Sequence, residues 1–277
     1  MSRRTEIPFW DPGELQQALS TQQLGHVLHV FNRITSTNEF AKRIARRGAA
    51  SGTLVLADMQ SAGRGRHGRR WESPAGKGLW FSFVLRCAAR TEQIGLLPLL
   101  VSAVLAEQFT SFFDRGFQVK WPNDLLADGK KVSGILCEVQ LTPPRVDFVI
   151  VGIGVNVNQS EGDFPPYLEG RAQSLAMVVQ RSVSRRALLL HVLEGLDRAF
   201  FSSAGLPIDK LAVWKATCAD IGRMITLRRG EAEFAGIFEE VTEQGELILR
   251  TGDRLQRLPA AELSLLKKSV AAAPLYE

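Results

Sequence analysis

Apolar positions recur along the chain with two different periods, and the period separates predicted strands from predicted helices. Short runs rich in leucine, valine and phenylalanine, bounded by glycine, proline or polar residues, are typical of strands. They predict strands over residues 27–34, 53–59, 78–86, 117–121, 132–140 and 146–157. Longer runs with apolar residues at helical spacing predict helices over residues 12–20, 40–45, 92–113, 184–201 and 208–218, of which 92–113 is expected to be mostly buried.

The pattern of apolar residues changes at Gly222. From there on, short strands are predicted over residues 224–227, 232–241, 246–249 and 255–258, joined by glycine-containing turns. A β unit of about 50 residues folds alone only marginally, so we expect it to pack on the larger part of the chain. The predicted organisation is therefore a lead-in over residues 1–25, a large domain over 26–221 and a small all-β barrel over 222–277.

Turn signals separate the remaining strands. Asp128-Gly129 predicts a hairpin turn, and Pro143-Pro144 predicts the turn between strands 132–140 and 146–157. Gly152 and Gly154 lie inside a predicted strand, and the third glycine of a dinucleotide fingerprint is missing. These two glycines are better explained by the close approach of another backbone or of a ligand.

The stretch Gln60–Trp71 concentrates four arginines and three glycines between two predicted strands. Guanidinium groups match carboxylates and phosphates, glycines leave backbone N–H groups uncovered, and Trp71 offers a flat ring for stacking. A disordered nucleic-acid tail or a simple solvated loop has a similar composition. Its position between two apolar strands favours a clamp for an anionic ligand with a flat base, such as a nucleotide.

Ser36 and Thr37 precede the predicted helix that Gly48 ends. A hydroxyl pair at this position is usually a helix cap and nothing more. The free N–H groups of a helix start, together with two hydroxyls, also suit a polar ligand. The residue types leave both interpretations open.

Composition and charge limit the class of protein. The chain has 277 residues, of which 45% are hydrophobic and 23% charged, as in ordinary soluble globular proteins. The longest apolar run, 94–113, is interrupted by polar residues, so we expect no membrane span, and the N-terminus does not resemble a signal peptide. A net charge of +5 can steer anionic ligands but does not indicate a DNA-binding face.

The cysteines and histidines indicate neither disulfides nor a zinc site. Cys87, Cys137 and Cys218 are isolated in apolar segments and are expected to be reduced core thiols, which favours a cytoplasmic protein. No cysteine or histidine cluster has the spacing of zinc ligands.

Four motifs together resemble those of the biotin protein ligases: Gly63–Trp71 (Gly-Arg-Gly-Arg-His-Gly-Arg-Arg-Trp), Lys120–Asp124 (Lys-Trp-Pro-Asn-Asp), Lys130–Leu136 (Lys-Lys-Val-Ser-Gly-Ile-Leu) and Gly152–Asn156 (Gly-Ile-Gly-Val-Asn). Ser36-Thr37-Asn38 fits the same family, and the resemblance covers about residues 26–265 in the same order. Longer members begin with a helix-turn-helix that binds DNA. That segment is not found here, so the monofunctional class without a repressor role is expected. His67 stands where many members have another basic residue.

The resemblance implies an α+β fold, in which a mixed-sheet catalytic domain of the biotin/lipoate ligase type carries a small C-terminal SH3-like β-barrel. It also implies an ATP-dependent ligase. The biotin carboxylate attacks the α-phosphate of Mg-ATP to give biotinyl-5′-adenylate, and a lysine of a biotin carboxyl carrier protein (a subunit or domain of acetyl-CoA carboxylase) then takes the biotinyl group. ATP, magnesium and biotin are substrates, no tightly bound cofactor is expected, and neither DNA nor a membrane is an expected partner.

The site residues follow from the matched motifs. The catalytic candidates are Arg66, Lys131 and Asp124. The resemblance implies biotin contacts from Ser36, Thr37, Asn38, Gln60, Arg64, Gly65, Arg66, Lys131 and Gly134, and ATP contacts from Arg64, Arg66, Arg69, Trp71, Asn123, Lys131 and Asn156. Asp124 is the candidate magnesium ligand; orienting the incoming lysine, or only forming an Asx turn, are its alternatives. Out of context Lys131 would be an ordinary turn lysine.

Two further hypotheses stay open at this point. A lipoate–protein ligase has the same fold and similar chemistry, although its Arg-Gly-Gly loop pattern differs from Gly-Arg-Gly-Arg. A nucleic-acid-binding module using the Arg/Gly loop would show salt-dependent binding of oligonucleotides and no catalysis.

Overall fold

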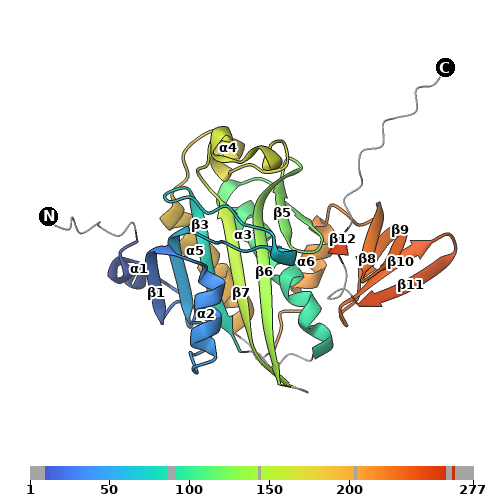
Figure 1. The fold of residues 1–277 in the computed structure, drawn as a ribbon, viewed down its shortest axis with the longest axis horizontal. Coiled ribbons are helices and arrows are strands. Elements are labelled where there is room, and N and C mark those ends of the chain that lie inside the picture. Colours follow the sequence, from blue (N-terminus) through green and yellow to red (C-terminus); the bar gives the residue numbers. More distant parts are fainter. Residues whose placement is uncertain (1–9, 87–90, 143–144, 203–204, 260–263, 266–277) are drawn as a thin grey trace.

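Seven strands form the central sheet of the protein, in the order β1-β2-β3-β7-β6-β5-β4 (Figure 1). The computed structural model describes residues 10–86, 91–142, 145–202, 205–259 and 264–265. The first two strands run parallel and the other neighbours are antiparallel. The strands are β1 (Leu28–Ile34), β2 (Leu54–Gln60), β3 (Gly78–Leu85), β4 (Gln118–Lys120), β5 (Asp124–Ala127), β6 (Lys130–Thr142) and β7 (Arg145–Asn156).

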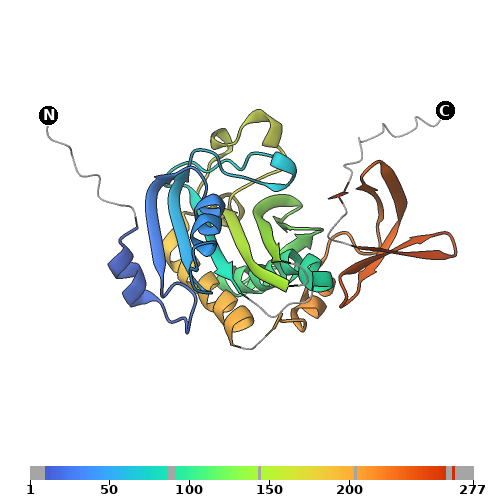
Figure 2. The same ribbon diagram turned by 60° about the horizontal axis from the view of Figure 1, so that its bottom comes forward.

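Helices cover both faces of this sheet, as Figure 2 shows for α2 on one side and α5 on the other. The helices are α1 (Pro12–Ala18), α2 (Thr37–Ala45), α3 (Leu97–Phe113), α4 (Leu175–Val179), α5 (Arg185–Phe201) and α6 (Lys210–Thr217). Side chains alternate between the faces along each strand. In β2, for example, Val55 packs with the small cluster beneath α2, whereas Leu54 and Leu56 join the large core on the opposite face.

A second, antiparallel sheet follows the central one and lies at the other end of the molecule from α1 (Figure 1). Its order is β11-β10-β9-β8-β12, with β8 (Met224–Arg229), β9 (Ala232–Val241), β10 (Glu246–Thr251), β11 (Arg254–Pro259) and β12 (Ser264–Leu265). The side chain of Phe238 packs between Trp121 and Trp214, with ring centroids at 6.4 and 6.2 Å. Asp220 accepts the backbone N–H of Trp121 at 2.9 Å. The two sheets therefore share a buried junction.

The α+β prediction, with a mixed sheet and a small C-terminal β unit, is confirmed. The boundaries at residues 26 and 222, and closure of the small sheet into a barrel, stay predictions. Strand β5 was missing from the sequence prediction, because Pro122 and the two polar residues after it resemble a turn. The predicted helix 92–113 begins as a 3₁₀ helix, Thr91–Leu96, and becomes an α-helix only at Leu97, where Pro98 occupies the first turn. The predicted turn at 143–144 and Cys87 lie outside the described residues.

The expectation about membrane spans needs one correction. The segment Gln93–Phe113 is long and apolar enough to cross a membrane by length and composition, with a mean hydropathy of 1.6. Its interrupting polar residues do not exclude a span. The fold accounts for its apolar character instead, because 61% of this window is buried inside the protein. Such burial is typical of the core helix of a globular domain.

Candidate active site

The start of α2 brings Ser36, Thr37 and Asn38 onto the sheet. Ser36 has extended backbone geometry at the N-cap position, but its side chain makes no capping hydrogen bond. Helix capping therefore does not explain why a hydroxyl residue stands at position 36. All three side chains are buried, although buried polar residues normally need partners.

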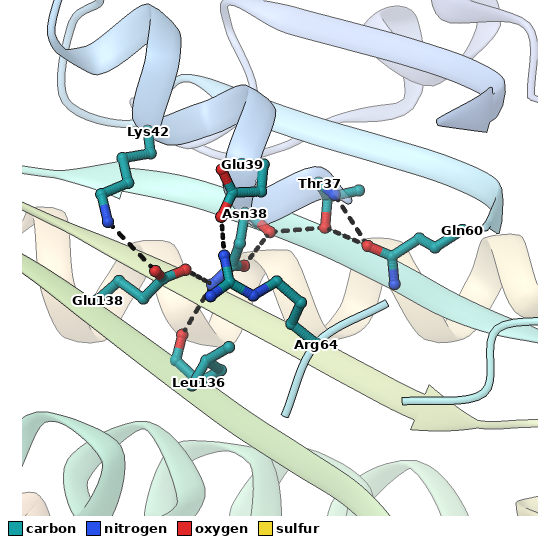
Figure 3. Close-up of polar contacts among 9 residues, drawn as sticks. Thr37, Asn38, Glu39, Lys42, Gln60, Arg64, Leu136 and Glu138 are labelled. Carbon is teal, nitrogen blue, oxygen red and sulfur yellow. Dashed lines mark hydrogen bonds and ion pairs between the residues drawn. The ribbon is translucent and has the colours of Figure 1, made fainter. Parts of the chain in front are cut away.

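Those partners form a buried polar cluster that crosses four elements (Figure 3). Gln60 Oε1 at the end of β2 accepts the backbone N–H of Thr37 at 2.8 Å and lies 3.1 Å from the Thr37 hydroxyl. Ser82 Oγ on β3 contacts both Thr37 Oγ1, at 2.7 Å, and Asn38 Oδ1, at 2.6 Å. Asn38 Nδ2 donates to Glu138 Oε2 on β6 at 2.9 Å. Three of the predicted biotin residues, Thr37, Asn38 and Gln60, thus lie together.

The arginine-rich stretch forms a small hairpin between β2 and β3. Arg64 and Arg70 pair as an antiparallel bridge, Gly65 N–H donates to the Arg69 carbonyl at 2.7 Å, and Trp71 N–H donates to the Gly63 carbonyl at 2.9 Å. A Cβ on Gly63 would lie 2.4 Å from the Trp71 carbonyl oxygen, so this closure requires glycine. The guanidinium of Arg64 forms an ion pair with Glu39 of α2 (Figure 3).

Trp71 lies against glycines of β6 and β7. A Cβ on Gly134 would lie 2.8 Å from the Trp71 ring, and one on Gly154 would lie 2.5 Å from it. A Cβ on Gly152 would meet Asn38 Oδ1. The glycines of the Gly152-x-Gly154 pattern therefore allow close approach, as the sequence indicated. Residues two apart on a strand share a face, so Asn38 and Trp71 are neighbours on one face of β7.

Lys131 lies beside Trp71 and pairs with Asp124. Lys131 Nζ lies 2.5 Å from Asp124 Oδ1 and 5.0 Å from the centre of the Trp71 ring. Burial lowers the pKa of Arg66, and the nearby carboxylate of Asp124 acts in the opposite direction. Lys131 and Asp124 are thus brought together, the charge of Asp124 acts on Arg66, and Lys131 is no solvated turn residue. In this structure Asp124 serves as the carboxylate partner of Lys131.

Other predicted residues have structural partners. Asn123 Nδ2 donates to the Ile135 carbonyl at 2.6 Å, and Asn156 Nδ2 donates to the Gln173 carbonyl at 3.3 Å. Arg69 is exposed, and its charge contributes to lowering the pKa of Arg66. The roles of these residues toward a nucleotide stay predictions.

Sequence reasoning missed Ser82 and Glu138, which complete the buried cluster, and Ser73, whose Oγ accepts from Gln60 Nε2 at 2.9 Å. The only available signals were a single polar residue in the apolar run Leu79–Leu85 for Ser82 and a single charged residue in Val132–Val139 for Glu138. It also missed Glu39, the partner of Arg64.

The described residues contain no group of three or more histidine, cysteine, aspartate or glutamate side chains that could hold a metal. Magnesium is usually bound through one or two carboxylates plus substrate phosphates, so Asp124 as a magnesium ligand stays a prediction. Cys137 and Cys218 are free thiols, and burial raises their pKa to about 12 and about 11. Both pack against the hydrophobic core, and a raised pKa keeps such a thiol in its protonated, less reactive form.

Two known protein families match this chain, one over the large sheet and one over the small sheet. Residues 30–158 match the Biotin/lipoate A/B protein ligase family, and residues 220–266 match the Biotin protein ligase C terminal domain. The biotin–[acetyl-CoA-carboxylase] ligase of Paracoccus denitrificans is 34% identical over 83% of this chain and 97% of the relative. The bifunctional ligase/repressor BirA of Bacillus subtilis (strain 168) is 34% identical over 92% of this chain and 80% of the relative.

The chain belongs to the biotin/lipoate protein ligase family. A structure of the Aquifex aeolicus biotin protein ligase in complex with biotin and ATP is 31% identical, covers 87% of this chain and 99% of that one, and has a TM-score of 0.73. This membership confirms the predicted ligase fold and the prediction of a ligase enzyme. The expected absence of a DNA-binding segment stays a prediction.

Proposed function

We propose that the protein joins biotin to ATP as biotinyl-5′-adenylate and transfers the biotinyl group to a lysine of a biotin carboxyl carrier protein. One structural observation supports this proposal independently of family membership. The uncharged cluster of Thr37, Asn38 and Gln60 and the cation of Lys131 occupy adjacent places on one face of the sheet. A ligand with a polar ring at one end and a carboxylate at the other fits this order.

In the first step two anions must meet. A carboxylate oxygen of biotin forms a bond to the α-phosphorus, and the bond from that phosphorus to the bridging oxygen breaks, releasing pyrophosphate. Lys131 and Arg66 would hold both anions and offset the charge that develops, an electrostatic role that needs preorganised cations. Asp124 keeps the ammonium of Lys131 in place at 2.5 Å before substrates bind.

In the second step the uncharged amine of the carrier lysine attacks the acyl carbon. The bond to the adenylate oxygen breaks, AMP leaves, and the amine proton passes to solvent. Relatives named as ligases of acetyl-CoA carboxylase support a carrier of that enzyme as the partner. We also propose magnesium as the companion of ATP and the cytoplasm as the place of reaction.

Exchange of labelled pyrophosphate into ATP tests the first step. We expect exchange that depends on biotin, with little in lipoate and none without either acid. Exchange that depends on lipoate and not on biotin would assign the protein to the other branch of the family. Binding of oligonucleotides with no exchange would contradict both ligase proposals.

A further inference from the structure

The buried polar cluster contains a row of four oxygen atoms (Figure 3). Asn38 Oδ1, Ser82 Oγ, Thr37 Oγ1 and Gln60 Oε1 follow one another at 2.6, 2.7 and 3.1 Å. None of the four residues is more than 9% exposed. Each of these close contacts needs a proton between its oxygens to be favourable.

The side-chain amides at the two ends of the row have fixed orientations. Asn38 faces the Glu138 carboxylate at 2.9 Å and the Leu136 carbonyl at 3.3 Å, and both of these groups only accept. Asn38 must therefore turn its NH₂ group toward them and its oxygen toward Ser82. At the other end, Gln60 Oε1 accepts the Thr37 backbone N–H at 2.8 Å, which fixes the amide of Gln60.

The row then has too few protons for all of its contacts to be hydrogen bonds. The two amide oxygens carry no proton, and the hydroxyls of Ser82 and Thr37 carry one each. Two protons must serve three contacts, so one contact stays without a proton. The longest, between Thr37 and Gln60 at 3.1 Å, fits this description. It leaves two acceptor oxygens side by side at the part of the site assigned to the ring of biotin.

We propose that Glu138 keeps this row one hydrogen-bond donor short, so that the site selects a ligand ring that supplies an N–H group. Lys42 holds the Glu138 carboxylate, with its Nζ 3.3 Å from Oε1. If Asn38 reversed, its NH₂ group would donate to Ser82, Ser82 to Thr37 and Thr37 to Gln60, and the row would need no ligand. Glu138 prevents that reversal because a carboxylate cannot donate.

The inference rests on the proposed function and deepens it. A cyclic urea carries N–H donors and completes the row. The disulfide ring of lipoate has none and would leave the acceptors buried without a partner, which is costly. Glu138 acts through Asn38, Ser82 and Thr37, and is therefore a positioning residue for ligand choice.

The direct test is Glu138→Gln, which keeps size and shape but can present either an oxygen or an NH₂ group to Asn38. We expect the dissociation constant for biotin, measured by calorimetry without ATP, to rise about tenfold, a scale typical of one buried hydrogen bond. The KM for ATP and the stability toward urea should stay unchanged. Glu240→Gln is the matched control, because Glu240 also pairs with a lysine, Lys215 Nζ at 2.9 Å, in the second sheet.

A second variant separates this relay from a general loosening of the site. Ser82→Ala interrupts the row, so Glu138→Gln should add no further loss of biotin affinity in that background. Losses that add independently would overturn the proposal, as would a Glu138→Gln protein that binds biotin as the wild type does. In either case the proposed function would stand. A wild-type protein that does not bind biotin would instead refute the proposed function.

Discussion

At the scale of single residues, two kinds of contact prepare the site. The neutral groups around Thr37 form a buried row of acceptor oxygens. Next to this row, Lys131 supplies a positive charge that Asp124 holds in place. Lys131 stays a predicted catalytic residue, and its ammonium lies 2.5 Å from Asp124 Oδ1 and 5.0 Å from the centre of the Trp71 ring. A compact charge held this way matches a carboxylate that meets a phosphate.

Replacing Lys131 tests this role. Lys131→Ala should lower biotin-dependent pyrophosphate exchange by at least ~10²-fold, the scale for losing a preorganised partner of transition-state charge. Lys130→Ala is the matched control, since the neighbouring lysine sits at the start of β6 and should leave exchange near the wild-type rate. Exchange by Lys131→Ala at the wild-type rate would remove Lys131 from the mechanism.

At the scale of elements, the segment after β7 is tied to the start of β3. Lys77 Nζ lies 2.9 Å from Asp163 Oδ2, and the backbone N–H and hydroxyl of Ser160 each donate to the same oxygen at 2.8 Å. The hydrogen bonds from Lys77 and Ser160 lower the pKa of Asp163 from 3.8 to about 2. The segment that carries Tyr167, which donates to Glu72 at 2.9 Å, is thereby held beside the arginine hairpin.

The lowered pKa predicts a pH dependence. Since the folded pKa lies below the unfolded one, the carboxylate stabilises the fold fully above about pH 4 and loses that effect as the pH falls toward 2. The loss of unfolding free energy in Asp163→Asn should therefore be constant from pH 7 to pH 5 and shrink between pH 4 and pH 3. Urea unfolding at each pH measures it, with Asp253→Asn, in an exposed turn, as control. A difference that stays constant down to pH 3 would contradict the assignment.

The positions of the helices and strands show how much of the fold the sequence could predict. Runs of apolar residues placed most strands and helices, because β3 is buried along its whole length and β2 along most of it, as their apolar residues suggest. The motifs correctly grouped Lys131 with Asp124, which form an ion pair. Ser82 and Glu138 could not be predicted, since Ser82 is the single polar residue of its apolar strand and Glu138 belongs to no motif. Their common partner, Asn38, lies far away in the sequence, and only strand register brings the three together.

At the scale of the whole molecule, the small sheet supports the segment that carries Asp124. Phe238 is fully buried against Trp121 and Trp214, and Asp220 holds the backbone of Trp121. Trp121 lies three residues before Asp124. We therefore predict that motion at this junction reaches Asp124, the partner of Lys131, and that the C-terminal sheet influences adenylation as well as stability.

Phe238→Ala tests that coupling. It should destabilise the junction by roughly 3–5 kcal/mol, as for other buried phenylalanines, and should also lower pyrophosphate exchange. Tryptophan fluorescence during urea unfolding follows the junction through Trp121 and Trp214. Phe234→Ala, a part-buried position on the same strand, should leave exchange unchanged. A folded Phe238→Ala protein with wild-type exchange would show that the sheet supports structure alone.

The most direct test of the whole account is the intact mass of a purified biotin carboxyl carrier protein after incubation with the enzyme, biotin and ATP. We predict that its mass increases by one biotinyl group, that the increase requires all three components, and that replacing the acceptor lysine of the carrier by arginine abolishes it. Lipoate in place of biotin should leave the carrier unchanged. A carrier whose mass does not change with active, folded enzyme, or one that accepts a lipoyl group instead, would contradict the account.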